Sequence, residues 1–351
     1  MGAGIAGLAA AWELARAGPR GGGSDVTILE SERRPGGVVV TERVDGFLVE
    51  GGPDGFLASE PELPALAKEV DIGDRVIDQR ERGTSLWSGG ELQPIDAGRA
   101  AVLLGIDAKA SDVAAGFRSF AGGMGELVMA VAQRLSGSLR LAQGVAGIAR
   151  EGKGWRLAIT GGSAHEADGI VLTLPAYTAG RLLEGIGVAG ARELAEVVYA
   201  PSITVSLAYR EADIGRPLSG AGFVVESPAP DQIRACTYAS QKFPGRAPEG
   251  HALLRAYLGP TDDHPAKLAR EQLASILAIR GEPLWSRVYF WTRGLPRYRA
   301  RHADLVASIR RRLERLPPLA IAGAGYDGAG VSACVRSGRA AARLIAQRTA
   351  R

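Results

Sequence analysis

The sequence predicts an α/β fold in which a Rossmann-like, dinucleotide-binding domain is interleaved with a mostly antiparallel sheet. The chain opens on a glycine-rich turn that leads into a helix, and a second turn of this kind follows the short apolar stretch at 319–323. Between them, at about 176–284, apolar runs of strand length alternate with turn residues, which is typical of an antiparallel sheet. At 351 residues the chain is long enough for one large domain or two interleaved ones.

The composition disfavours several classes of protein. Hydrophobic residues make up 46% and charged residues 23% of the chain, as in globular proteins, and no apolar run reaches the roughly 18 residues of a membrane span. The first residues lack the pattern of a signal peptide. A net charge of +4 without a long basic block disfavours nucleic acid as a partner. It fits an acidic small molecule and an anionic membrane surface equally well.

Neither the cysteines nor the histidines predict a reactive site. Cys236 and Cys334 are far apart in the sequence, and we interpret them as reduced core thiols, with a disulfide as the alternative. The four histidines show no metal-ligand spacing, so no metal is expected. A nucleophile motif such as Gly-x-Ser-x-Gly does not occur, and the sequence assigns no catalytic residue.

The first eight residues, Met-Gly-Ala-Gly-Ile-Ala-Gly-Leu, match Gly-x-Gly-x-x-Gly at the start of a helix. Gly2 permits a tight turn, Gly4 admits a pyrophosphate to the backbone, and Gly7 lets the helix pack closely on its sheet. The N–H groups of the first helical turn then hold the phosphates. Such a fingerprint follows a buried strand, and here only Met1 precedes it. We therefore expect the first strand to be missing and the sequence to list part of the natural chain.

Three further features extend this predicted site. The short apolar strand at 26–29 ends on Glu30, where a dinucleotide fold places the carboxylate that binds the adenosine ribose. An exposed glutamate at a strand end is the alternative. Gly36 and Gly37 make a second place where the backbone can pass close to a cofactor. Residues 51–55, Gly-Gly-Pro-Asp-Gly, are of the types that favour a turn, so a turn is predicted there.

Together these stretches resemble the flavin-dependent amine oxidase superfamily, in its protoporphyrinogen/coproporphyrinogen oxidase branch. In this resemblance residues 2–7 are the FAD-diphosphate loop, Glu30 is the ribose carboxylate, and residues 45–56 run beneath the flavin ring. The loop Ser-Gln-Lys-Phe-Pro-Gly-Arg-Ala-Pro-Glu-Gly at 240–250 resembles a loop of the porphyrinogen oxidases, and so does the tail through residue 341.

The resemblance implies FAD as the cofactor and a set of residues that contact it. For Val145 and Trp291 an ordinary core residue is the alternative. The residues implied in FAD binding are Gly2, Ala3, Gly4, Ile5, Ala6, Gly7, Glu30, Arg33, Gly36, Gly37, Val38, Gly52, Pro53, Asp54, Gly55, Val145, Trp291, Ala324, Ala329, Gly330 and Val331.

In the same family a hairpin leads into a long helical lobe that covers the substrate. Thr-Ser-Leu-Trp-Ser-Gly-Gly-Glu-Leu at 84–92 predicts this hairpin, with its turn at Gly89 and Gly90. An arginine on this strand binds a substrate propionate in several family members. Here Thr84 falls at that position, with Arg80 and Arg82 just upstream, and these three are the candidate substrate residues.

A short bridge at 95–116, long enough for one helix, stands where the lobe is expected, so the lobe is predicted to be largely absent. The predicted FAD-binding domain is discontinuous and comprises 1–75, 117–175 and 285–351. The predicted substrate domain comprises 76–94 and 176–284.

The resemblance implies an FAD-dependent oxidoreductase that oxidises protoporphyrinogen IX or coproporphyrinogen III to the porphyrin in haem biosynthesis, with O2 as oxidant and H2O2 as product. It implies a cytoplasmic protein and leaves open a peripheral contact with the inner face of the cell membrane and a homodimer. The alternatives are an amine or polyamine oxidase, a carotenoid or phytoene desaturase, and a truncated, non-catalytic flavoprotein.

Overall fold

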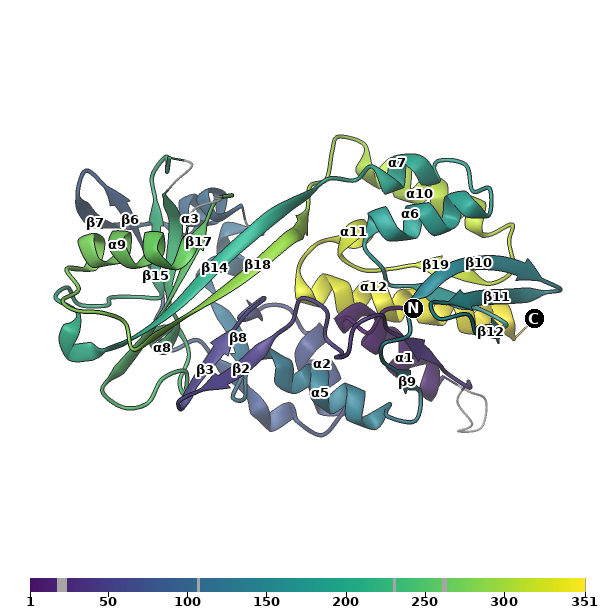
Figure 1. The fold of residues 1–351 in the computed structure, drawn as a ribbon, viewed down its shortest axis with the longest axis horizontal. Coiled ribbons are helices and arrows are strands. Elements are labelled where there is room, and N and C mark those ends of the chain that lie inside the picture. The colour runs from purple at the N-terminus through teal and green to yellow at the C-terminus, as the bar shows by residue number, and fades with distance from the viewer. Residues whose placement is uncertain (18–23, 106–107, 230–231, 261–263, 351) are drawn as a thin grey trace.

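The computed structural model describes residues 1–17, 24–105, 108–229, 232–260 and 264–350. The molecule is elongated and has two halves, joined by a pair of long strands (Figure 1). One half contains a seven-stranded sheet. The other half contains the two ends of the chain, where the purple helix α1 (Ile5–Arg16) and the yellow helix α12 (Val331–Thr349) pack against each other. We call these the sheet half and the nucleotide half.

Two short pairs of parallel strands form the centre of the nucleotide half. β1 (Ile28–Leu29) pairs with β9 (Leu139–Arg140), and β13 (Ile170–Leu172) pairs with β19 (Leu319–Ile321). The first three residues of the chain, Met1 to Ala3, lie between the two pairs. β1, β13 and β19 are apolar and buried throughout, which is typical of parallel strands that are covered on both faces.

Helices and a β-meander cover the two faces of these strands. α1 and α12 cover one face and cross so closely that a Cβ on Gly338 would lie 2.1 Å from Ala6 O. The meander of β10 (Val145–Glu151), β11 (Gly154–Ile159) and β12 (Ala164–Ala167) covers the other face, where Leu157 packs against Leu172 in one hydrophobic core.

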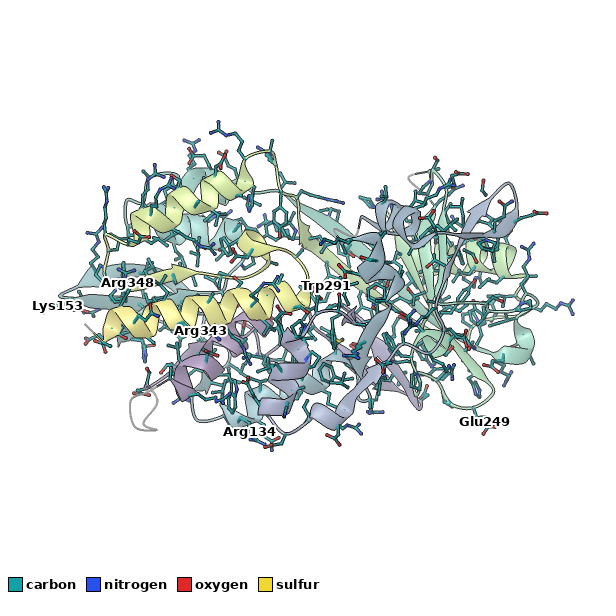
Figure 2. The ribbon with its side chains drawn as sticks, turned by 180° about the vertical axis from the view of Figure 1, so that it is seen from behind. Arg134, Lys153, Glu249, Trp291, Arg343 and Arg348 are labelled. Atoms are coloured by element: carbon teal, nitrogen blue, oxygen red, sulfur yellow. The ribbon has the colours of Figure 1, made fainter. Side chains whose placement is uncertain are left out.

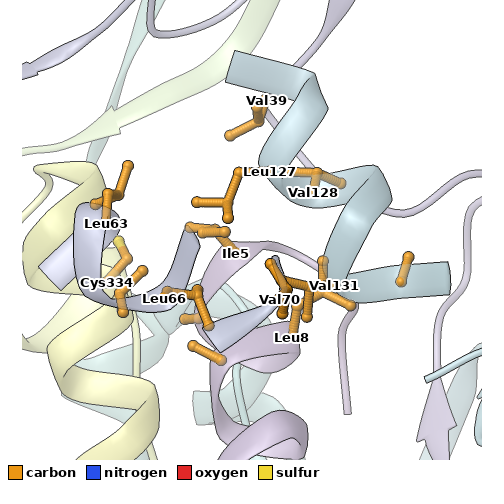
Figure 3. Packing of buried hydrophobic residues seen from close by; sticks show 14 of the residues in the cluster. Ile5, Leu8, Val39, Leu63, Leu66, Val70, Leu127, Val128, Val131 and Cys334 are labelled. Carbon is orange, nitrogen blue, oxygen red and sulfur yellow. The ribbon is translucent and has the colours of Figure 1, made fainter. Parts of the chain in front are cut away.

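Two further helices, α2 (Glu62–Glu69) and α5 (Met124–Arg134), pack on α1. Figure 3 shows this core, where Leu63 and Leu66 from α2 and Val131 from α5 surround Ile5 and Leu8 from α1. Cys334 from α12 also lies in this core, and both cysteines are buried and free, which confirms the prediction of reduced core thiols.

A second helical group covers the β13–β19 end of the nucleotide half. α6 (Ala176–Gly185), α7 (Ala191–Ala195) and α10 (His302–Leu313) share a core with β13 and β19. The short helix α11 (Ala324–Asp327) connects β19 to α12.

The sheet half is built on one mixed sheet with the order β18-β14-β17-β16-β15-β6-β7. All its pairs are antiparallel except β15 with β6. α9 (Pro265–Leu277) packs on the sheet. The strands are β18 (Trp285–Pro296), β14 (Tyr199–Arg210), β17 (His251–Leu258), β16 (Ile233–Tyr238), β15 (Gly222–Val225), β6 (Thr84–Ser88) and β7 (Glu91–Ile95).

Smaller elements lie where the two halves meet. They are the hairpin β2 (Thr41–Val44) with β3 (Phe47–Glu50), the three-stranded sheet β4 (Phe56–Leu57), β8 (Phe117–Phe120) and β5 (Val76–Asp78), and the helix α8 (Ala239–Lys242). The described residues also form two short 3-10 helices, η2 (Gly73–Arg75) and η3 (Glu211–Asp213).

The structure tests several of the sequence predictions. The hairpin of β6 and β7 is confirmed, with positive φ angles of 61° at Gly89 and 85° at Gly90 in its turn. The bridge, which is long enough for one helix, contains two short ones. Gly105, at φ +66°, ends α3 (Ala97–Leu104), and a separate helix, α4 (Ala110–Ala114), follows.

The predicted domain boundaries stay a prediction. α6 and α7, which the sequence places in the substrate domain, share a core with strands of the nucleotide half. β18, which the sequence places in the FAD-binding domain, belongs to the seven-stranded sheet. Among the described residues no helix combines the length and the hydropathy needed to cross a membrane.

Candidate active site

The N-terminal turn at Gly2–Gly7 has the geometry of an anion site. Gly4 is the N-cap of α1, and no side chain caps the helix, so the N–H groups of its first turn have no partner within the helix. A Cβ on Gly4 would meet no atom within 4 Å, whereas a Cβ on Gly7 would lie 1.9 Å from Gly2 O. Gly7 therefore closes the turn, and the backbone at Gly4 stays open to a ligand.

Glu30 lies directly beside this turn. Its Oε2 accepts the N–H of Ala3 at 2.6 Å, and its Oε1 accepts the N–H of Glu32 at 2.8 Å. The Ser31 hydroxyl also donates to Oε1, at 3.2 Å, so Oε2 is the oxygen that keeps a second lone pair for a ligand hydroxyl. At the start of β10, a Cβ on Gly144 would lie 3.4 Å from Cβ of Ser31, so Val145 enters the same corner as Glu30.

The Gly36–Gly37 loop lies against the N-terminal turn. The Gly36 N–H donates to Ala3 O at 2.8 Å, and Gly36 forms an isolated parallel bridge with Gly4. A φ of +105° at Gly36 and of +58° at Gly37 explains why glycine stands at both positions. The two glycine loops predicted from the sequence therefore make one continuous backbone surface.

The Gly51–Gly55 loop passes over the end of this surface. A Cβ on Gly52 would lie 1.7 Å from Val38 O, so only glycine fits there. The Trp291 indole donates to Gly51 O at 2.8 Å and fixes the loop to β18, near the middle of the molecule (Figure 2). Val38 beside it is 46% exposed, which leaves an apolar side chain at the surface of the site.

The C-terminal turn repeats the design of the N-terminal one. Gly330 is the N-cap of α12, again without a side-chain cap, and a Cβ there would meet no atom within 4 Å. Ser332 is fully buried in the first turn of α12, and its Oγ has no hydrogen-bond partner in the described part of the chain. The Tyr298 hydroxyl donates to Ala324 O and holds the start of this turn.

The two turns lie close together. A Cβ on Gly323, at the end of β19, would lie 3.6 Å from Cβ of Ala6 in α1. Ala329 in the C-terminal turn is exposed, and Val331 is half-buried against the core that contains Ile5. Two helix N-termini therefore point their positive dipole ends to one region, which favours a ligand with more than one negative charge.

A buried ion pair connects this region to the sheet half. The Lys242 ammonium lies 2.9 Å from Asp54 Oδ2, and it also lies over the ring of Phe117, 4.7 Å from the centroid. Burial alone would raise the pKa of Asp54, but the cations of Lys242, Arg255 and Arg246 outweigh burial and hold this pKa below its usual value. Asp54 is therefore a fixed negative charge within the Gly51–Gly55 loop.

Arg246 extends this buried network. It is 2% exposed and donates to Ser119 Oγ at 2.9 Å and to Phe120 O at 3.0 Å. The Ser119 hydroxyl in turn donates to Asp54 O at 2.8 Å. On the other side, burial raises the pKa of Glu50, whose carboxylate accepts the Met124 N–H at 2.8 Å.

The structure does not bring the three candidate substrate residues into one cluster. Arg80 is exposed and donates to Ser240 O at 2.7 Å, so it holds the 240–250 loop. Arg82 is exposed beside Gly116, and Thr84 is half-buried at the start of β6.

Sequence reasoning gave no individual role to several residues of this region. Arg34 donates to Gly37 O at 2.7 Å, whereas Arg33, which the resemblance implies as an FAD contact, is exposed and forms no hydrogen bond or ion pair with the described residues. Lys242 and Arg246 belong to the 240–250 loop, whose resemblance marked it without a role for each residue. No pattern in the sequence marked Ser332 as a site residue.

These residues fit FAD by their own chemistry. Two uncapped helix N-termini match a diphosphate, and the open space over Gly4 and Gly330 lets a ligand reach the backbone. The unpaired, buried Ser332 Oγ lacks a partner that a polar ligand group would supply. Glu30 provides the acceptor that a ribose needs.

Comparison with known proteins agrees with this fit. Residues 5–122 and 108–346 match the family described as flavin containing amine oxidoreductase. The chain belongs to this family. It is therefore an FAD-dependent oxidoreductase, and the resemblance predicted from the sequence is confirmed.

Two curated relatives and one solved structure are similar to nearly the whole chain. It is 25% identical to a coproporphyrinogen III oxidase of Propionibacterium freudenreichii subsp. freudenreichii, over 97% of this chain and 88% of that protein. It is 27% identical to the enzyme of that name from Mycobacterium bovis, over 98% of this chain and 96% of the relative. A solved structure from Exiguobacterium sp. 255-15, assigned as a protoporphyrinogen oxidase, has a TM-score of 0.83 at 24% identity and covers 100% of this chain and 98% of that one.

These matches also show that the relatives are longer. The alignment with the Propionibacterium protein extends over 478 residues, against the 351 of this chain, so it opens long gaps in this chain. The family match consists of two segments, 5–122 and 108–346, which overlap at 108–122 across the end of the bridge.

Proposed function

We propose that this protein oxidises a porphyrinogen to the corresponding porphyrin in haem biosynthesis, with coproporphyrinogen III as the first candidate and protoporphyrinogen IX as the second. The observation that carries the proposal is the convergence of two uncapped helix N-termini, Glu30 and the Gly51–Gly55 loop on one site. Support for the substrate class comes from the names of relatives that match nearly the whole chain.

The proposed roles of the residues follow from this geometry. The N–H groups of α1 and α12 would hold the diphosphate, and Glu30 would hold the ribose. When bound, FAD supplies the hydride acceptor, and O2 would take the electrons from it to give H2O2. Trp291 and Gly52 fix the loop on which the ring system would rest, and Val38 offers it an apolar contact.

The Asp54–Lys242 ion pair would hold the Gly51–Gly55 loop in a fixed position relative to the sheet half. Both side chains are largely buried, at 20% and 11% exposure, so the loop cannot lift without separating two poorly solvated charges. Loop and substrate platform therefore move as one body, which keeps a bound macrocycle in register with the reacting ring.

The substrate would bind on the sheet half, with its propionates at cationic side chains. Arg82 is the candidate for such a contact, because it is exposed and forms no ion pair with the described residues, whereas Arg80 holds the 240–250 loop. The family match that breaks at the bridge supports the proposal that residues 95–116 replace the helical lobe. A cytoplasmic location, a peripheral membrane contact and a homodimer belong to the same proposal.

The test is an anaerobic reduction of the FAD-loaded chain, followed by readmission of O2. Coproporphyrinogen III should bleach the flavin absorbance, and O2 should restore it with formation of H2O2. Loss of bleaching with both porphyrinogens, in a protein that holds FAD, would contradict the proposal. Bleaching by putrescine instead would indicate an amine oxidase, and bleaching by phytoene a desaturase.

A matched pair of variants locates the propionate contact. Arg82→Gln should raise KM about tenfold with little change in kcat, because a contact shared by ground state and transition state is lost. Arg156→Gln on β11, an exposed arginine of the meander, should leave both constants unchanged. Equal effects of the two substitutions would remove Arg82 from the site.

A further inference from the structure

Arg255 lies on the face of the seven-stranded sheet that adjoins the predicted cofactor site. Side chains alternate along β17, and Leu254 lies in the core beneath α9, so Arg255 points to the opposite face. Tyr289 of β18 packs against the small core that contains Leu253, on that opposite face. A Cβ on Gly51 would lie 2.5 Å from the Tyr289 ring. The loop that begins at Gly51 therefore lies against the same side of the sheet as Arg255.

The guanidinium of Arg255 lacks the partners that a buried cation needs. Arg255 is 5% exposed, and its Nη2 lies 3.5 Å from Thr204 Oγ1, at the limit of a hydrogen bond. Its Nε is buried and has no partner in the described part of the chain, and Arg255 forms no ion pair there. The ring of Tyr257 lies 5.1 Å from Cζ, which leaves the polar edge of the guanidinium unused. Such a group is costly to bury unless a ligand pairs with it.

The acids of the same buried network are already engaged by other cations. Asp54 Oδ2 accepts from the Lys242 ammonium at 2.9 Å, although Arg255 also contributes to the low pKa of Asp54. The charge of Glu50 is opposed by Arg246, and burial raises the pKa of Glu50 toward its neutral form. Among the described residues of this network three cations therefore face two acids. The excess positive charge is at Arg255.

A carboxylate is the anion that fits this position. A guanidinium pairs with a carboxylate through two parallel N–H donors, and Nε is one of the donors available for such a pair. The diphosphate of FAD is already accounted for by the N-termini of α1 and α12 in the nucleotide half. The remaining source of a carboxylate is the substrate.

The two candidate substrates differ in this group. Coproporphyrinogen III carries propionates at positions where protoporphyrinogen IX carries vinyl groups. Propionates that meet the exposed Arg82 stay at the surface, so the opposite edge of the flat macrocycle faces the buried groups of the sheet. That inner edge ends in carboxylates in coproporphyrinogen III and in apolar vinyl groups in protoporphyrinogen IX.

We infer that Arg255 is a specificity-determining residue, which binds a propionate at the inner edge of the macrocycle and selects coproporphyrinogen III over protoporphyrinogen IX. The inference rests on the proposed function. A propionate would pair with the free Nε and give the buried cation its counter-charge. A vinyl group in its place would leave the guanidinium buried and unpaired, and a site with an unpaired polar group rejects the ligand that leaves it so.

The test measures binding without turnover. Coproporphyrin III and protoporphyrin IX, the stable oxidised forms, are titrated against the FAD-loaded chain and followed by porphyrin fluorescence. Arg255→Met should raise the Kd of coproporphyrin III about thirtyfold and that of protoporphyrin IX less than about threefold, because only the first loses a charge-assisted pair. Arg255→Lys keeps the charge and should retain most of the selectivity. Arg234→Met, at an exposed arginine of β16, is the matched control and should change neither Kd.

A stability measurement separates this role from a structural one. Methionine removes an unpaired buried charge, so the melting temperature of the FAD-free Arg255→Met chain should be unchanged or higher. A lower melting temperature with equal losses for both porphyrins would overturn the inference, and so would absence of coproporphyrin III binding to the unmodified chain. Selective binding in a chain whose flavin no porphyrinogen bleaches would contradict the proposed oxidation and still support the carboxylate contact of Arg255.

Discussion

At the C-terminal turn, β19 runs directly into Gly323 and is paired with β13 along its whole length. At the N-terminal turn, residues 1–3 lie between β1 and β13 without forming a strand of their own. They are held by hydrogen bonds with Leu29, Val171 and Thr173, and Thr173 donates from both its N–H and its hydroxyl. Both turns present an uncapped helix N-terminus beneath open backbone. The two turns therefore present the same kind of uncapped helix N-terminus to a ligand. They differ in the segment that precedes the turn, which is a paired strand only at the C-terminal turn. The N-terminal turn must depend more on packing between its own glycines.

The largest effect is expected from Gly7→Ala. The new Cβ would lie 1.9 Å from Gly2 O, so the turn must open, and the free energy of unfolding should fall by about 3 kcal/mol. Thermal and urea unfolding of the FAD-free chain measure this loss. Gly4→Ala is the matched control, because its Cβ meets no atom, and it should leave the FAD-free stability nearly unchanged. Equal destabilisation by both would show that the turn does not depend on close packing at Gly7.

The second effect is a pH dependence that belongs to the N-terminal turn alone. When the 351-residue chain is made with Met1 as its first residue, burial lowers the pKa of the Met1 amine from its ordinary value of 8.0 to about 6, so the unfolded chain binds more protons between these values. Stability should therefore rise from pH 6 to pH 8, by roughly 1–2 kcal/mol. Urea unfolding of the native and the N-terminally acetylated chain across this range isolates the amine. A rise that persists after acetylation would assign it to other groups.

The third effect concerns ligand affinity and should be similar at both turns. Gly4→Ala and Gly330→Ala each place a methyl group in the open space over a helix N-terminus. Each should weaken FAD binding about tenfold, since the diphosphate can no longer approach the backbone. Titration of the FAD-free chain, followed by flavin fluorescence, gives both constants. If only one substitution acts, the cofactor uses one helix end rather than two.

The smallest effect is expected at Ser332, in the C-terminal turn. Its buried Oγ has no partner within the described chain, so Ser332→Ala should leave the FAD-free protein equally stable or slightly more so. FAD affinity should fall about fivefold, because the ligand loses a hydrogen bond of about 1 kcal/mol. Opposite signs for stability and affinity distinguish a ligand contact from a core residue. Thr at this position restores the hydroxyl and serves as the conservative variant.

Much of the predicted cofactor site could be located from the sequence, because glycine marks positions where the backbone has a positive φ angle or leaves no room for a side chain. Gly36 has a φ angle of +105°, and a Cβ on Gly52 would lie 1.7 Å from Val38 O, so both positions require glycine and are visible as glycine in the sequence. The hairpin turn at Gly89–Gly90 was predictable for the same reason.

Other features were hidden because they depend on tertiary contacts. Arg33 and Arg34 are chemically identical in sequence, and only the fold decides that Arg34 reaches Gly37 O. The pairing of Lys242 with Asp54 joins residues 188 positions apart. Substrate residues were the least predictable, since Arg80 is used to hold a neighbouring loop.

The long strands β14 and β18, each of 12 residues, have a consequence for how the molecule unfolds. They pair along most of their length and carry the chain out of the nucleotide half and back into it. Neither half is thus one continuous stretch of sequence, and neither can be cut out as a fragment without severing strands of the other. Loss of order in one half removes anchor points from the other, so heat or denaturant should produce a single cooperative transition. Substitutions in the seven-stranded sheet would then reduce flavin retention, even where the substituted side chain does not approach the cofactor.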